Sequence, residues 1–130
     1  MPGAAERPLS PHLQIYRPML TMMMSIVHRV TGVALYFGTL LLMIWLTAAA
    51  TSPDAFDTVN GLYGSWLGLL VLVGCSWALI HHAIGGIRHF IWDTGAGFGS
   101  EARELLARIT IGGSLTLTLL LWIIIWAVKG

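Results

Sequence analysis

Four of the five histidines lie within or beside long apolar stretches, where ionisable side chains are unusual. His82 and His89 are seven residues apart, so on a helix they share one face at an axial separation of ~10 Å, whereas His81 points ~100° away from His82. Ionisable residues inside a membrane segment are costly and usually face a cavity, a partner or a cofactor. His82 is therefore a candidate functional residue. A hydrogen bond to a neighbouring helix is the structural alternative.

Ser25, His28 and Arg29 form a second polar group, with the i, i+3, i+4 spacing that places side chains on one face of a helix. Together they can contact a single ligand. The same residues also have a structural explanation, because an arginine can reach the lipid headgroups and a serine can cap a helix. The nearby histidines of the later segment favour the functional interpretation.

Gly85 and Gly86 follow His82 by about one helical turn. Without side chains, they allow a flat macrocycle or another helix to approach the backbone closely. A neutral imidazole, a bare stretch of backbone and the cations Arg29 and Arg88 are together what a haem requires: an axial ligand, a slot and partners for its propionates. Helix packing explains the glycines equally well, so both interpretations stand at this point.

Long apolar helices must position these residues, because 56% of the 130 residues are hydrophobic and only 10% are charged. Spanning a hydrocarbon core of ~30 Å takes ~20 helical residues. Three stretches contain no Asp, Glu, Lys or Arg and are long enough: 30–50, 58–87 and 109–128. The sequence therefore predicts an all-α integral membrane protein with three transmembrane helices, at about 23–50, 58–92 and 103–128.

Residues 1–22 are expected to form a short cytoplasmic, interfacial segment that precedes the three-helix unit 23–130. Pro8, Pro11 and Pro18 prevent one continuous helix there, and the segment has no apolar core of a signal peptide. A glycine-rich loop after Asp93 is expected to end the second helix, and Ser100 to begin the next.

Basic residues are distributed unevenly over the two sides of the predicted bundle. Lys129 alone lies on one side, and the loop 51–57 on that side contains two aspartates and no positive charge. The other six lie before the first span or around the loop between the second and third: Arg7, Arg17, Arg29, Arg88, Arg103 and Arg108. The positive-inside rule then places the N-terminus in the cytoplasm. We expect a bacterial cytoplasmic membrane in preference to the mitochondrial inner membrane.

Two other classes of function receive no support from the sequence. The net charge is +1 and there is no basic run or stripe, so nucleic acid is not an expected partner. The single cysteine, Cys75, lies in the middle of an apolar stretch and is expected to be a packing residue, since it can form neither an internal disulfide nor a paired-cysteine metal site.

Two long, gapped motifs contain these polar residues. The first is Arg7-Pro8-Leu9 followed by Ser25-x-x-His28-Arg29-x-Thr31-Gly32, and the second is His82-x-x-x-Gly86-Ile87-Arg88-His89-Phe90-x-Trp92-Asp93-x-Gly95. On both motifs the sequence resembles the family of cytochrome b membrane-anchor subunits of succinate dehydrogenase, respiratory complex II. The resemblance covers nearly the whole chain, and the family's three-span topology agrees with the one reached above from charge and hydropathy.

The resemblance implies a subunit that docks an iron–sulfur subunit and a flavoprotein and helps to pass electrons from succinate to ubiquinone. Such a subunit has no catalytic residue for succinate and no complete active site alone. The resemblance also implies that His82 is one axial ligand of the iron of a haem b, whose other ligand belongs to a second, smaller anchor subunit. His81, which precedes the ligand, departs from the family's pattern, and the spacing to the rest of the motif selects His82.

The remaining site residues are also assigned by this resemblance. Ser25, Ile26 and Arg29 would bind ubiquinone, the substrate of this subunit. His28 and Arg29 would reach toward the haem propionates. For Arg88 and His89 the resemblance implies contact with either the propionates or a soluble partner, and these two residues complete the expected set (Ser25, Ile26, His28, Arg29, His82, Arg88 and His89).

Two alternatives belong to other classes of protein. In a proton or ion pathway, His28, His82 and His89 would relay protons through the membrane. The outer halves of the three spans argue against this, because they offer no ionisable residue to continue the relay. In a cofactor-free assembly subunit, the chain would only pack helices.

Overall fold

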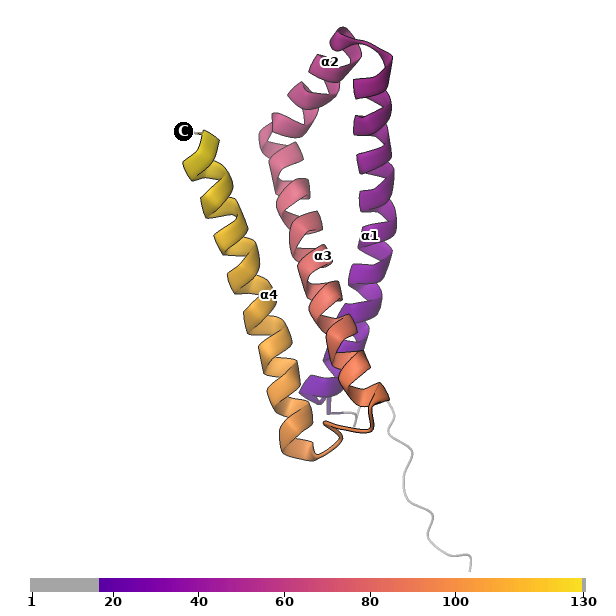
Figure 1. The fold of residues 1–130 in the computed structure, drawn as a ribbon, viewed down its shortest axis with the longest axis vertical. Helices are drawn as coiled ribbons and strands as arrows, with labels where there is room; N and C mark the ends of the chain where they lie inside the picture. Colours follow the sequence, from indigo (N-terminus) through magenta and orange to yellow (C-terminus); the bar gives the residue numbers. More distant parts are fainter. Residues whose placement is uncertain (1–16, 130) are drawn as a thin grey trace, which may run out of the picture.

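The computed structural model describes residues 17–129, which form four helices. These are α1 (Leu20–Thr51), α2 (Pro53–Gly64), α3 (Trp66–Asp93) and α4 (Ser100–Lys129). Helices α1, α3 and α4 run alongside one another, and α2 lies at the end of the molecule opposite the loop between α3 and α4 (Figure 1). Most of the predicted interfacial segment 1–22 lies outside the described residues.

Three of these helices are long and apolar enough to cross a membrane: α1 with 32 residues, α3 with 28 and α4 with 30. At a rise of ~1.5 Å per residue each exceeds the ~30 Å hydrocarbon core. Their outer surfaces carry large apolar side chains in the open, such as Phe37 and Leu119, which a bilayer would cover. The predicted fold class, an all-α integral membrane protein with three spans, is confirmed.

The second predicted helix, 58–92, differs from the structure because the chain breaks at Ser65 into α2 and α3. Ser65 has an extended backbone, with ψ 161°, and its hydroxyl oxygen accepts a hydrogen bond from the Gly68 N–H at 3.1 Å. The same hydroxyl donates to the Leu62 carbonyl at 2.6 Å. Serine competes with helical hydrogen bonding in this way, so it ends one helix and caps the next.

Helix α3 lies in the centre and packs on α1 and on α4. Its interface with α4 is built from small residues, since Ala78 of α3 and Ala107 and Ser114 of α4 are almost completely buried. Small side chains let membrane helices approach closely, so that dispersion contacts and interhelical hydrogen bonds stabilise the pair. The core of this protein therefore lies along the two faces of α3.

The glycine-rich loop after α3 ends that helix as expected. Gly95 and Gly97 have φ angles of 81° and 77°, a left-handed conformation that other residues rarely adopt. The Trp92 indole N–H donates to the Gly97 carbonyl at 3.3 Å, which ties the loop to the last turn of α3. Helix α4 then begins at Ser100, the residue predicted to start it.

Replacing Gly68 by alanine is expected to destabilise the corner between α2 and α3. A Cβ at this position would meet the backbone carbonyls of Leu62 and Tyr63, which cannot retreat without distorting α2. We expect a loss of roughly 1–3 kcal/mol, the usual cost of overpacking. Gly74→Ala is the control, because a Cβ there meets nothing within 4 Å. Circular dichroism during thermal unfolding in detergent measures both, and equal unfolding midpoints would contradict this account of the corner.

Candidate functional site

The imidazoles of His28 and His82 lie face to face between α1 and α3. Their ring centroids are 3.9 Å apart and the ring planes are 7° from parallel. Both side chains are half-buried. The structure therefore brings together two of the predicted site residues that are 54 positions apart in the sequence.

Hydrogen bonds from α1 determine which nitrogen of His82 carries a proton. The Nδ1 atom lies 3.2 Å from the backbone carbonyl oxygen of His28 and 3.3 Å from the hydroxyl oxygen of Thr31. Because a carbonyl oxygen only accepts, Nδ1 must carry the hydrogen and donate it. The lone pair of a neutral imidazole is then on Nε2, which has no hydrogen-bond partner in the described part of the chain. This is how protein metal sites commonly fix an imidazole ligand.

Glycines form the walls around the two imidazoles. A Cβ added at Gly32 of α1 would lie 3.2 Å from Cε1 of His82, and one added at Gly85 of α3 would lie 2.6 Å from Nδ1 of His28. Gly85 is therefore needed for the packing of α3 on α1. Gly86 is different, because a Cβ there would meet nothing within 4 Å. The two glycines therefore differ. Gly85 is required for helix packing, whereas the space beside Gly86 is open.

His89 and Arg88 continue the site toward the end of α3. The His89 ring meets the His28 ring edge to face, with centroids 5.0 Å apart. Arg88 is only 3% exposed, and its guanidinium carbon lies 5.1 Å from the centroid of the Trp92 ring, a cation–π contact within the helix. Its Nε atom is buried without a hydrogen-bond partner, as is Nδ1 of His28. The site therefore contains polar atoms that this chain, over its described residues, leaves unsatisfied.

His81 faces the opposite side of α3 and belongs to the core. It is 1% exposed, and its Nδ1 lies 3.0 Å from the Ser114 hydroxyl of α4. The Trp77 ring packs beside it, with centroids 5.1 Å apart. Its Nε2 atom is buried and has no partner among the residues described. A ligand could reach this nitrogen only by separating α3 from α4.

Ser25, Ile26 and Arg29 lie on the exposed side of α1. The helix begins at Leu20 with Met19 as its N-cap, so Ser25 does not cap it and this structural explanation is wrong. Ile26 is 50% exposed. The His28 side chain points inward and stacks on His82, whereas Ser25 and Arg29 are exposed. The three residues expected on one helical face therefore have different environments.

Thr31 and Gly32 are parts of the site to which the sequence assigned no role, although both occur in the first motif. Thr31 is 1% exposed, and its hydroxyl donates to the His28 carbonyl at 2.9 Å while lying beside Nδ1 of His82. The i, i+3 spacing from His28 was a signal that the two share a face. Only the packing of α1 on α3 shows that this face meets His82.

Comparison with known proteins gives a match over almost the whole chain. Residues 4–127 match the family described as the succinate dehydrogenase/fumarate reductase transmembrane subunit. This chain belongs to that family. The matched region contains every predicted site residue, and the resemblance based on the two motifs is confirmed.

Individual members of the family are similar over most of their length. The succinate dehydrogenase cytochrome b556 subunit of Paracoccus denitrificans is 44% identical over 119 residues, which cover 92% of each chain. The subunit of the same name from Rickettsia conorii is 36% identical over 118 residues, 91% of this chain and 92% of its own. The mitochondrial cytochrome b560 subunit of Sus scrofa is 42% identical over 98 residues, 72% of this chain and 56% of its own.

Proposed function

We propose that this transmembrane subunit is the large membrane anchor of a succinate:ubiquinone oxidoreductase, and that it holds a haem b together with a second, smaller anchor subunit. The relatives named cytochrome b556 support a haem. One observation carries the assignment to a residue: of the two adjacent histidines on α3, His81 is buried against α4, whereas His82 is half-buried with Nδ1 engaged and Nε2 without a partner. His82 is the proposed axial ligand.

The residues around His82 fit a b-type haem. The His28 carbonyl and the Thr31 hydroxyl hold the imidazole by Nδ1, which leaves the Nε2 lone pair for iron. The space beside Gly86 leaves room for a flat ring close to the backbone of α3. A haem held by His82 and a second imidazole would have no open position, so it would supply storage and transfer of single electrons rather than oxygen binding.

The propionates of the haem are assigned to His28 and Arg29, with Arg88 and His89 as the nearest further candidates. The family resemblance carries the assignment of His28 and Arg29. For Arg88 the structure adds support, because its Nε donor is buried without an acceptor among the described residues, which is costly. Carboxylates are suited to such donors, and charge-assisted hydrogen bonds to them are strong. Contact with a soluble partner remains the alternative role for Arg88 and His89.

Ubiquinone is proposed to bind at Ser25, Ile26 and Arg29. Full reduction of a quinone takes two electrons and two protons, and negative charge develops on its oxygens. The Arg29 guanidinium and the Ser25 hydroxyl can donate hydrogen bonds to those oxygens and stabilise the charge. Ile26 offers an exposed apolar surface beside them for the quinone ring.

The remaining parts of the proposal concern partners and location. An iron–sulfur subunit and a flavoprotein would dock at the end of the bundle that carries the histidines and arginines, and succinate would be oxidised in the flavoprotein. We place the chain in a bacterial cytoplasmic membrane with the N-terminus in the cytoplasm, because Arg17, Arg29, Arg103 and Arg108 are at that end. There, protons for the quinone have a short path from solvent.

The proton or ion pathway is less well supported than the haem. Beyond the histidines, the three spans contain no Asp, Glu, His, Lys or Arg over 30–51, 66–80 and 109–128. A relay of protons needs successive titratable groups or water, and beyond His81 and His82 these stretches supply no carboxylate or imidazole to continue it. A cofactor-free assembly subunit is less well supported, because the relatives are named cytochrome b556 subunits.

Replacing His82 and His81 in turn tests the ligand assignment. His82→Gln is expected to abolish the reducible b-type absorption of the purified complex, because the amide cannot replace an imidazole at the iron. His81→Gln is the matched control: glutamine can still bond to Ser114, so haem content is expected to stay near that of the wild type. Loss of haem in His81→Gln together with full retention in His82→Gln would refute the assignment.

The open space beside Gly86 gives a second test. Gly86→Leu is expected to lower the haem-to-protein ratio of the complex several-fold, because the side chain would occupy space that the macrocycle needs. Gly74→Leu on the same helix is the control, since a Cβ at either position meets no protein atom within 4 Å. Haem content is measured from the pyridine haemochrome spectrum. Normal haem in Gly86→Leu would place the ring elsewhere.

Removing the Arg29 guanidinium tests the quinone site. Arg29→Ala is expected to reduce succinate:quinone activity by about 100-fold, the usual loss for one donor to a developing oxyanion. Succinate oxidation with a water-soluble dye, which accepts electrons before the membrane domain, should be unchanged. Leu40→Ala, at an exposed position about three turns further along α1, is expected to have normal activity in both assays. Unchanged quinone reduction by Arg29→Ala would remove the role given to Arg29.

A further inference from the structure

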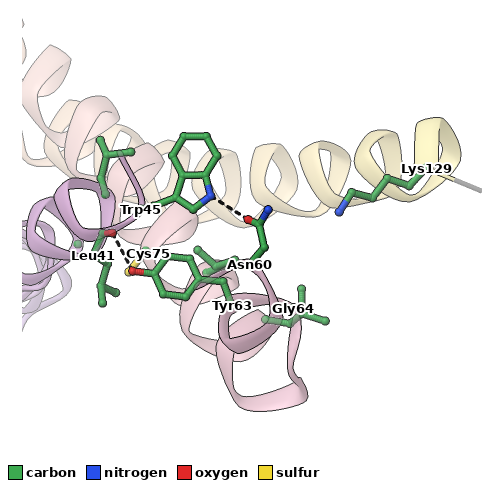
Figure 2. Close-up of a pocket in the computed structure, with 11 residues that line it drawn as sticks. Leu41, Trp45, Asn60, Tyr63, Gly64, Cys75 and Lys129 are labelled. Atoms are coloured by element: carbon green, nitrogen blue, oxygen red, sulfur yellow. Dashed lines mark hydrogen bonds between the residues drawn. The ribbon is translucent and has the colours of Figure 1, made fainter. Parts of the chain in front are cut away.

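A pocket of about 560 Å³ lies at the end of the bundle that carries α2, far from the histidines. Side chains of α1, α2 and α3 line it, together with Lys129 from the end of α4 (Figure 2). Its volume lies within the roughly 300–1,000 Å³ of typical small-molecule sites. None of the residues that line it belongs to the proposed haem or quinone site.

The pocket extends from the end of the span toward the middle of the membrane. Along α1 its lining continues from Trp45 to Gly38, an axial distance of ~10 Å. Cys75 lies opposite Gly38, where a Cβ added to the glycine would be 3.6 Å from its sulfur. Between these ends the walls are mostly leucine, for example Leu42 and Leu72. An elongated apolar group therefore fits the pocket parallel to the helices.

Two polar side chains of the lining donate to this chain, whereas the amide nitrogen of Asn60 and the ammonium of Lys129 have no hydrogen-bond partner among the described residues. The Trp45 indole N–H donates to Asn60 at 2.9 Å, and the Tyr63 hydroxyl donates to the Leu41 carbonyl at 2.7 Å (Figure 2). Lys129 makes no ion pair with any described residue, and no Asp or Glu lines the pocket. The result is an apolar groove with an ammonium group at its mouth that has no acidic partner among the described residues.

We propose that this pocket binds an anionic phospholipid from the leaflet at the α2 end, with one acyl chain in the groove and the phosphate at Lys129. The apolar walls match the acyl chain, and the ammonium is complementary to the charged headgroup. A neutral quinone or an apolar helix of a partner subunit would fill the groove equally well but would leave Lys129 unpaired. Charge complementarity therefore selects the lipid.

Photolabelling of the purified complex in lipid nanodiscs tests this proposal. Phosphatidylglycerol and phosphatidylcholine, each with a diazirine in one acyl chain, are compared, and labelled residues are located by peptide mass spectrometry. Phosphatidylglycerol is expected to label the pocket residues Leu42 and Leu72 about five-fold more than phosphatidylcholine, the preference that one basic residue gives. The apolar groove of Leu115 and Leu119, which lacks a basic residue, should show no preference.

Variants of Lys129 test whether the lipid headgroup is recognised or whether any acyl chain fills the groove. Lys129→Gln is expected to remove the preference for phosphatidylglycerol at Leu42, and Lys129→Arg to keep it. Lys129 is exposed on the last turn of α4, so both variants should assemble. Equal labelling by the two lipids in the wild type, or a preference that persists in Lys129→Gln, would overturn the proposal. An unlabelled pocket would also overturn it, because protein or quinone would then be the occupant.

Discussion

The hydrogen bond from His82 to the backbone carbonyl of His28 is the interaction on which the site depends. It joins α3 to α1 and gives the His82 imidazole a defined tautomer. Thr31 strengthens the arrangement, because its hydroxyl donates to the same carbonyl and lies beside the same nitrogen. In an apolar environment a buried polar group without a hydrogen bond is costly, so these bonds restrict the orientation of the His82 ring. The orientation of Nε2, the proposed ligand nitrogen, is thereby fixed by contacts within this chain.

The same constraint explains the opposite roles of two adjacent histidines. Because side chains on a helix turn by ~100° per residue, His81 meets α4 while His82 meets α1. His81 is satisfied in part by Ser114 and is buried between α3 and α4, with the Trp77 ring beside it. His82 is held by α1 and remains half-buried. One helix thus uses its two faces for different purposes, packing on one and a proposed ligand on the other.

The two ends of the helix bundle carry different chemical groups. The end near the α3–α4 loop has imidazoles, guanidinium groups and buried nitrogens without partners among residues 17–129. The other end has an apolar pocket, the hydrogen bonds of Trp45 and Tyr63, and the ammonium group of Lys129. Because the apolar middle of the three spans would lie in the hydrocarbon core, the two ends of the bundle would face opposite leaflets.

The sequence by itself determined the fold class, the three spans and the set of polar residues that could bind a ligand. Hydropathy and charge patterns are local properties of the sequence, and in a membrane they are sufficient to identify the spanning helices. The family resemblance also selected His82 as the expected haem ligand, which stays a prediction. The sequence did not predict the break between α2 and α3 at Ser65. A serine side chain ends a helix when its hydroxyl bonds to nearby backbone groups, and these bonds are seen only in the structure. Only the tertiary structure decided that Thr31 holds His82, and that Gly85 packs whereas Gly86 stays open. These differences depend on which face of α1 meets α3, a long-range contact that no local pattern contains.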